Sequence, residues 1–234
     1  ACVASLLVLI AGCDKDKKGV VPPAELVDLK PTLAVQKLWD TGVGGGGEKL
    51  RLTLGLALDG GVLYTAARDG EVIALDPASG RAKWSQDTKA DLAAGPGVGA
   101  SLVAVGTSDG KVIALDVASG KVLWQASVSS EVLSAPLVTG DRVIVRSVDG
   151  RVHALDALTG KSQWTGEEPV PKLSLRGTAP PVLAKDNVIA GFDSGKVIAF
   201  AVATGDIVWQ AQVTTPGGRS ELARLADVDS AVQV

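Results

Sequence analysis

The chain has 234 residues, and 46% of them are hydrophobic, so it can bury the core of one large domain or of two small ones. Its formal net charge is only −3, which argues against a nucleic-acid partner because such a partner requires a basic face. The sequence contains no methionine, and we therefore expect a fragment whose natural start is missing.

The N-terminal residues resemble the signal peptide of a bacterial lipoprotein. The run "ACVASLLVLIAGC" has the length of a signal-peptide hydrophobic region and is too short for a membrane span, which requires about 20 apolar residues. The segment from Ile10 to Cys13 resembles a lipobox, which implies cleavage before Cys13 and lipidation of its thiol. The polar segment "DKDKKGVVPPAE" that follows suits a tether between a lipid and a domain. The alternative is an ordinary hydrophobic region with an incidental cysteine.

The rest of the chain is a repeat that ends in tryptophan. Successive tryptophans are 45, 40, 40 and 45 residues apart, at Trp39, Trp84, Trp124, Trp164 and Trp209. Four copies are alike: "DGEVIALDPASGRAKW", "DGKVIALDVASGKVLW", "DGRVHALDALTGKSQW" and "SGKVIAFAVATGDIVW". Each copy indicates two strands joined by a tight turn, with two more strands upstream. Four short strands in about 40 residues are typical of a β-propeller blade, so we predict an all-β propeller with about four blades.

We expect these tryptophans to be structural. Neighbouring blades pack face to face, and a wide flat side chain fills the gap between them. The indole N–H can then donate to a backbone carbonyl of the next blade.

The pattern "VIALDxxSGKxxW" resembles the tryptophan-docking repeat of the PQQ-like, or quinoprotein-type, β-propellers. The resemblance implies a closed ring of eight blades, of which about four would be here. We therefore expect a partial lipoprotein signal peptide at residues 1–12 and a lipidated cysteine with a polar tether at 13–34. An incomplete propeller, truncated at its C-terminus, would occupy residues 35–234.

Some proteins with this repeat are dehydrogenases that bind pyrroloquinoline quinone and calcium, with a catalytic aspartate and usually a vicinal cysteine pair. Here no cysteine follows Cys13. Aspartates recur at equivalent positions of the repeat, as turn residues do: Asp69, Asp109 and Asp149, and Asp76, Asp116 and Asp156. We therefore expect no enzymatic activity, no metal and no cofactor. The alternatives are a PQQ-dependent dehydrogenase-like protein and another periplasmic binding module of this repeat family.

Two further features have unremarkable interpretations. His153 occupies the position that Ile73, Ile113 and Ile198 fill in the other copies, so we expect it to replace a buried or half-buried apolar residue. The glycines Gly44–Gly47 lack the lysine and the helix of a phosphate-binding loop, and they indicate a flexible connector.

Two connectors between blades are longer than the others. From each tryptophan to the start of the next blade there are 12 residues after Trp84 and Trp124, but 16 after Trp164 and 23 after Trp209. Connectors of one class emerge on one face of a propeller, so we expect the long ones to lie side by side. Insertions of this kind often bind partners. The candidate partner-binding residues are Leu173, Leu175, Arg176, Asp227 and Asp229. In the alternative, the leucines cap the blade edge and the aspartates pair with Arg176 inside the fold.

The lipobox, the propeller repeat, "LSLRG" and "RLADVD" together resemble the BamB family, lipoproteins of the outer-membrane β-barrel assembly machinery, the BAM complex. The resemblance implies a non-catalytic scaffold that binds the POTRA domains of BamA and aids assembly and insertion of outer-membrane proteins. The five candidate residues above match the contact motifs of this family. The resemblance also places the protein at the periplasmic face of the outer membrane, anchored through Cys13. Asp14, directly after that cysteine, would favour retention in the inner membrane in some bacteria.

Overall fold

The computed structural model describes residues 24–25, 27, 32–45, 47, 50, 52–175, 179–220, 222, 225–228 and 230–233. The chain divides into two units, Ala1–Gln36 and Lys37–Val234, and the strands lie in the second. The described residues form no α-helix, and therefore none that is long and apolar enough to cross a membrane.

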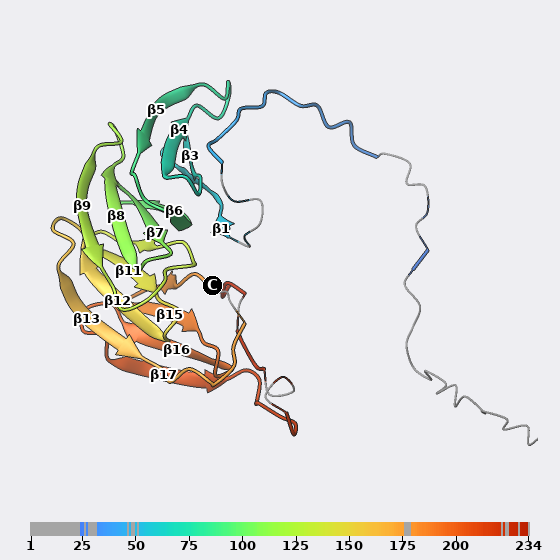
Figure 1. Cartoon of the computed structure of the whole chain (residues 1–234), viewed down its shortest axis with the longest axis vertical. Coiled ribbons are helices and arrows are strands. Elements are labelled where there is room, and N and C mark those ends of the chain that lie inside the picture. The colour runs from blue at the N-terminus through green and yellow to red at the C-terminus, as the bar shows by residue number, and fades with distance from the viewer. Residues whose placement is uncertain are drawn as a thin grey trace, which may run out of the picture. The chain divides into compact units, whose positions relative to one another are not determined.

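The strands form four sheets, called blades 1 to 4 here in chain order (Figure 1). Blade 1 contains β2 (Leu56–Asp59), β3 (Val62–Ala66), β4 (Glu71–Leu75) and β5 (Ala82–Asp87). Blade 2 contains β6 (Leu92–Gly99), β7 (Leu102–Thr107), β8 (Lys111–Asp116) and β9 (Val122–Ser127), and β1 (Thr53–Leu54) pairs with β6 in parallel. Blade 3 contains β10 (Leu137–Val138), β11 (Arg142–Arg146), β12 (Arg151–Asp156) and β13 (Ser162–Glu167). Blade 4 contains β14 (Val182–Ala184), β15 (Asn187–Gly191), β16 (Lys196–Ala201) and β17 (Ile207–Gln212).

This arrangement confirms the predicted all-β propeller with four blades. The four consecutive strands of each blade pair antiparallel, and the parallel pair of β1 and β6 adds a fifth strand to the sheet of blade 2. The blades follow one another in chain order along an arc, from β3–β5 to β15–β17 (Figure 1). A ring of eight blades stays an expectation from the family resemblance.

Apolar side chains fill the interfaces between neighbouring blades. Successive residues of a strand point to opposite faces of its sheet. In β11, Val143 and Val145 therefore join the core shared with blade 2, and Ile144 joins the core shared with blade 4. A third core of the same kind lies between blades 1 and 2 and includes Tyr64 and Ile113. Blades 2 and 3 are thus each stabilised mainly by the two blades beside them.

Four of the tryptophans dock onto the following blade, as predicted. Trp124 is only 8% exposed, and its Nε1–H donates to the carbonyl oxygen of Ala157 at 2.8 Å. Its ring lies against Gly160, where an added Cβ atom would come within 2.6 Å of the ring. The same two contacts join Trp39 to Pro77 and Gly80, Trp84 to Val117 and Gly120, and Trp164 to Val202 and Gly205.

The repeated aspartates form turns between the third and fourth strands of a blade. Asp116 Oδ1 accepts the backbone N–H of Ser119 at 2.8 Å and its hydroxyl at 2.5 Å. These hydrogen bonds stabilise the carboxylate and lower the pKa of Asp116 below its usual 3.8. Asp76 and Asp156 make the equivalent bonds to Ser79 and Thr159. The prediction that these aspartates are turn residues is confirmed.

Two hydrogen bonds hold Gly44 and Gly45, which belong to the segment expected to be a flexible connector. The N–H of Gly44 donates to Glu71 Oε2 at 2.8 Å, and the N–H of Gly45 donates to Asp69 Oδ2, also at 2.8 Å. Two carboxylates of blade 1 therefore anchor this segment. The glycine composition gave no indication of those acceptors.

Candidate partner-binding site

The two long connectors meet. The first leaves β13 and leads to β14, and the second follows β17. The backbone N–H of Leu175, in the first connector, donates a hydrogen bond to Asp227 Oδ2, in the second. This contact spans 52 residues of sequence and confirms the prediction that the two connectors lie side by side.

The first connector is anchored at its start by Glu168. The N–H of Glu168 donates to the carbonyl oxygen of Gly150 at 3.0 Å. Its carboxylate, which is almost fully buried, pairs with Lys196 of blade 4 at 2.9 Å. Val170 then covers Gly150, at which an added Cβ atom would lie 2.7 Å from Val170. Glu168 therefore fixes the point at which the chain leaves blade 3.

The second connector is anchored along blade 4. The N–H of Val228 donates to the carbonyl oxygen of Phe192 at 3.2 Å, and the Val228 side chain lies against Gly191. In the connector to blade 3, Val132 makes the equivalent bond to Thr107 at 3.1 Å and lies against Gly106. Val228 therefore occupies the ordinary position that precedes a blade, and the additional residues lie between β17 and Val228.

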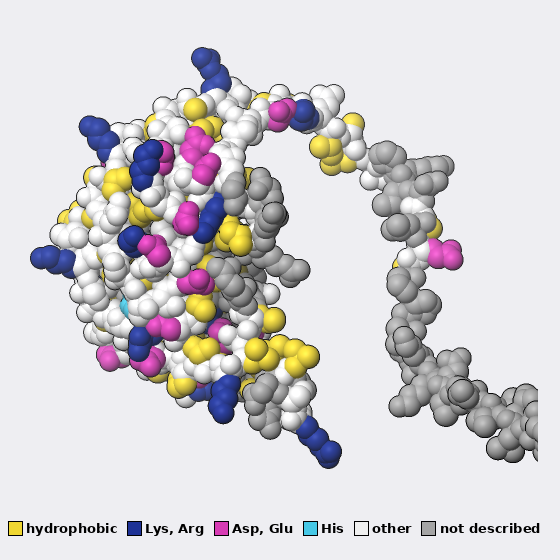
Figure 2. All heavy atoms as spheres, viewed as in Figure 1, with side chains coloured by type: hydrophobic (Ala, Val, Ile, Leu, Met, Phe, Trp, Pro, Cys, Tyr) yellow, Lys and Arg dark blue, Asp and Glu magenta, His cyan; other side chains and the backbone are white. Residues whose placement is uncertain are grey.

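Both connectors carry exposed apolar side chains. Leu173 is 43% exposed and Leu175 is 53% exposed. Leu222, in the second connector, is 71% exposed. Figure 2 shows hydrophobic side chains gathered at the lower end of the molecule, where Figure 1 places blade 4. About half of the surface of Leu173 and of Leu175 is therefore available for contact with a partner.

Asp227 has a structural contact of its own. One carboxylate oxygen accepts the Leu175 amide, and the other, Oδ1, is buried and has no hydrogen-bond partner. The predicted site residues Arg176 and Asp229, and the predicted lipidation site Cys13, lie outside the described residues. The structure therefore brings Leu175 and Asp227 together, with Leu173 two residues before Leu175 in the chain.

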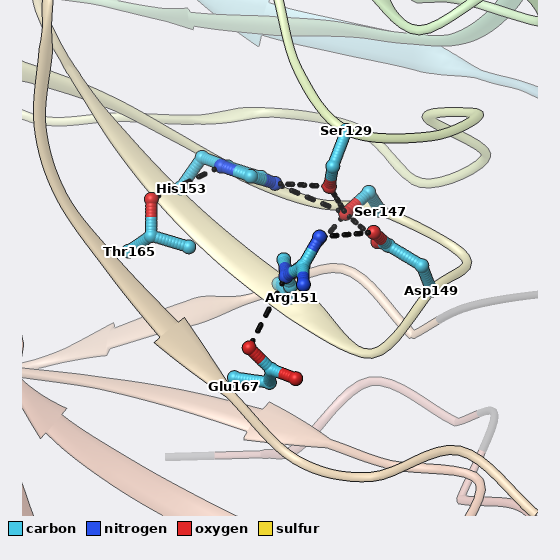
Figure 3. Close-up of polar contacts among 7 residues, drawn as sticks. All are labelled: Ser129, Ser147, Asp149, Arg151, His153, Thr165 and Glu167. Carbon is cyan, nitrogen blue, oxygen red and sulfur yellow. Dashed lines mark hydrogen bonds and ion pairs between the residues drawn. The ribbon is translucent and has the colours of Figure 1, made fainter.

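A second polar cluster surrounds His153 in blade 3 (Figure 3). His153 is 7% exposed, and its Nε2 lies 3.0 Å from Ser129 Oγ and 3.1 Å from Ser147 Oγ. Its Nδ1 lies 3.3 Å from Thr165 Oγ1. Burial lowers the pKa of His153, although the nearby Asp149 carboxylate opposes that shift. The predicted buried position is confirmed, but hydrogen bonds accompany it.

The His153 cluster has the composition of a catalytic triad without its geometry. In a triad, a carboxylate orients the histidine through the ring nitrogen that faces away from the serine. Here Asp149 instead accepts the hydroxyl of Ser147 and pairs with Arg151 at 3.1 Å (Figure 3). The cluster therefore joins the connector that carries Ser129 to blade 3, and Nδ1 of His153 faces the Thr165 hydroxyl and not a carboxylate.

A buried ion pair between blades 3 and 4 is a feature that the sequence reasoning missed. Arg146, at the end of β11, is fully buried, and its Nη2 donates to Asp193 Oδ1 at 2.6 Å. Its guanidinium lies 5.0 Å from the centre of the Phe192 ring. A signal was available, because the equivalent positions of the other copies hold Ala66, Gly106 and Gly191. Among the described residues, no group of three or more His, Cys, Asp and Glu side chains could hold a metal ion.

Comparisons with known proteins agree with this fold. A family model described as "Outer membrane protein assembly factor BamB" matches residues 34–93 and 68–234. The protein of that name from Pseudomonas aeruginosa is 54% identical over 229 residues, which are 98% of this chain and 60% of that relative. The one from Kangiella koreensis is 49% identical and covers 96% of this chain and 58% of that relative. The chain thus spans about 60% of the length of these curated relatives.

Solved structures show the same likeness. The crystal structure of BamB from Moraxella catarrhalis matches with a TM-score of 0.73 and 30% identity, over 77% of this chain and 55% of that one. The quinohemoprotein alcohol dehydrogenase from Comamonas testosteroni matches with a TM-score of 0.55 and 21% identity, over 70% of this chain and 35% of that one, and shows the fold alone. With its repeat, its fold and these relatives, the chain belongs to the BamB family of outer membrane protein assembly factors.

Proposed function

We propose that this protein is a non-catalytic scaffold lipoprotein of the outer-membrane β-barrel assembly machinery. It binds the POTRA domains of BamA and aids the assembly and insertion of outer-membrane proteins. The observation that carries this proposal is the hydrogen bond from Leu175 to Asp227, which joins the two long connectors into one surface. The names of the curated relatives support the part of this role that concerns the assembly of outer-membrane proteins.

The surface has the composition of a compact protein interface. Leu173 and Leu175 each expose about half of their surface, and Arg176 follows directly in the sequence. An apolar centre with an arginine beside it is typical of the few residues that dominate binding energy. Leu173, Leu175 and Arg176 contact the partner in this proposal, and Asp229 contributes a second charge.

Asp227 has a different role in the proposal. Because its carboxylate accepts the Leu175 amide, it holds the first connector in the binding conformation. Asp227→Asn retains a side-chain oxygen that can accept this hydrogen bond, whereas Asp227→Ala removes it. We expect POTRA binding to weaken by less than about threefold in the first variant and by roughly tenfold or more in the second. Equal, large losses of affinity in both variants would show that the partner interacts directly with the charge of Asp227.

The membrane attachment is proposed from the sequence. A lipid on Cys13 anchors the protein at the periplasmic face of the outer membrane, and residues 13–34 serve as the tether. Asp14 makes retention at the inner membrane the competing destination. Metabolic labelling with a fatty-acid analogue, in wild type and in Cys13→Ala, tests the anchor, and fractionation of the two membranes tests the destination.

The proposal assigns no enzymatic activity to the protein. The competing function is a PQQ-dependent dehydrogenase-like protein, which the structural likeness to quinohemoprotein alcohol dehydrogenases suggests at the level of the fold alone. Calcium-dependent uptake of the quinone, detected by its absorbance, would support that alternative.

The binding proposal is tested by titrating purified tandem POTRA domains into the protein. We expect Leu173→Ala with Arg176→Ala to weaken binding by about 3 kcal/mol, which is roughly a hundredfold in Kd, without a change in thermal unfolding. The matched control is Leu158→Ala with Lys161→Ala, which removes the same kinds of side chain from an exposed turn at the opposite end of blade 3. Equal affinities for the two double variants would refute the assigned surface.

A further inference from the structure

The ion pair of Arg146 and Asp193 lies under the two long connectors. Arg146 ends β11 in blade 3, and Asp193 follows β15 in blade 4. Both side chains are buried, at 0% and 2% exposure, and the atoms Arg146 Nη2 and Asp193 Oδ1 lie 2.6 Å apart. The pair therefore ties blade 3 to blade 4 at the end from which the connectors emerge.

Arg146 stands where the repeat requires a small residue. At the equivalent positions, an added Cβ atom on Gly106 would lie 2.4 Å from Val132, and one on Gly191 would lie 2.7 Å from Val228. A valine of the following connector thus packs directly on the sheet at these two interfaces. Arg146 fills that space in blade 3, so the connector from blade 3 to blade 4 cannot pack in the same way.

Stability alone does not account for this pair. A buried ion pair repays its desolvation only with good geometry and further hydrogen bonds, and apolar replacement is often neutral or stabilising. Two more guanidinium nitrogens, Nε and Nη1, are buried without a hydrogen-bond partner. An uncharged pair of similar volume would avoid those costs. We therefore infer that the pair fixes the position of blade 4 relative to blade 3, because ion pairs and hydrogen bonds depend on direction.

Contacts lead from this pair to the binding surface. The Arg146 guanidinium lies 5.0 Å from the centre of the Phe192 ring, next to Asp193. The Phe192 carbonyl accepts the N–H of Val228 at 3.2 Å. Val228 directly follows Asp227, whose carboxylate accepts the Leu175 amide. The position of the turn at Phe192 thus sets the positions of both connectors.

We propose that Arg146 and Asp193 are positioning residues for the partner-binding surface. They fix the turn after β15 against blade 3, and this turn holds Asp227 and, through it, Leu175. This inference rests on the proposed function, since the surface is the one assigned to POTRA binding. The exchange measurement below tests the positioning without any partner.

The test variant is Arg146→Met with Asp193→Ser. Methionine retains most of the volume against Phe192, and serine is the residue at the equivalent position Ser108. We expect the thermal midpoint to stay within about 5 °C of wild type, because the variant leaves no unpaired charge. Hydrogen exchange at the Leu175 amide should become roughly tenfold faster, and the Kd for tandem POTRA domains should rise by a similar factor.

The matched control is Arg142→Met with Asp141→Ser. Arg142 pairs with Asp141 and also donates to Ala203 of blade 4 at 3.4 Å, but it lies at the opposite end of β11. This control should leave both exchange and affinity unchanged. Arg146→Lys, which keeps the charge pair, should restore most of the slow exchange at Leu175.

The outcomes separate the two proposals. If the wild type does not bind POTRA domains, the proposed function fails, and the exchange data still decide the positioning role. A folded double variant with wild-type exchange and affinity would overturn the positioning role. Loss of the folded state in the double variant would overturn it as well, because the pair would then serve stability.

Discussion

Docking of a tryptophan against a glycine of the next blade is the contact that repeats throughout this fold, and Gly160→Ala tests it. Gly160 has φ of +69°, and a side chain in this left-handed region costs about 1–2 kcal/mol. The new Cβ atom would also lie 2.6 Å from the Trp124 ring. The Trp124 ring cannot move away freely, because it is 8% exposed and its Nε1–H is hydrogen-bonded to the carbonyl oxygen of Ala157. Overpacking of this kind adds about 1–3 kcal/mol, so we expect a total loss of roughly 2–5 kcal/mol.

Gly60→Ala supplies the matched control. Gly60 also has positive φ, at +54°, but nothing lies within 4 Å of an added Cβ atom. This variant should lose only the backbone contribution, about 1–2 kcal/mol. Urea denaturation of wild type and both variants, followed by far-UV circular dichroism, measures the two losses. If Gly160→Ala costs no more than Gly60→Ala, the ring does not restrict this position and the docking argument is refuted.

Two further predictions concern the same blades. Trp124→Ala should lower the free energy of unfolding, measured in urea, by about 3–5 kcal/mol. Trp209 is 42% exposed, so Trp209→Ala should lower it by less than about 1 kcal/mol. Similar losses in the two variants would contradict the docking role. His153 has a pKa below its ordinary 6.5 when folded, so the unfolded chain binds more protons as the pH falls, and stability should decrease below about pH 6.5. His153→Ile, which restores the residue of the other copies, should lose less stability than wild type between pH 7 and pH 5; equal losses would assign the pH dependence to other groups.

Much of the fold could be predicted because the same contact recurs in several copies of the repeat. The glycine of each "SG" or "TG" turn receives the tryptophan of the preceding blade, and Asp76, Asp116 and Asp156 form the turns expected of them. The side-by-side position of the long connectors followed from counting residues against the period. The contact between Leu175 and Asp227 confirms that reasoning. The residue count could not predict that the donor in this contact is the backbone N–H of Leu175.

Other contacts could not be predicted because only one copy has them. Arg146 and Asp193 are 47 residues apart, and nothing in a single sequence indicates which buried charges pair. The serines around His153 likewise come from separate segments, with Ser129 in a connector and Ser147 after β11. The repeat shows where a residue is exceptional, as it does at Arg146 and His153, and the structure is needed to show its partner.

Arg146 and His153, the two residues that depart from the repeat, both lie in blade 3, and their contacts extend to the two sides of this blade. Because side chains alternate along a strand, Arg146 points towards blade 4, and the next residue, Ser147, points towards the connector from blade 2. Blade 3 thus adds polar, directional contacts on both sides, to Asp193 and to Ser129, to the apolar cores that it shares with its neighbours. Apolar packing tolerates small shifts between blades, whereas hydrogen bonds and ion pairs specify direction. A blade from which the proposed binding loop emerges benefits from that restriction, because a displacement between blades 3 and 4 would separate Leu175 from Asp227.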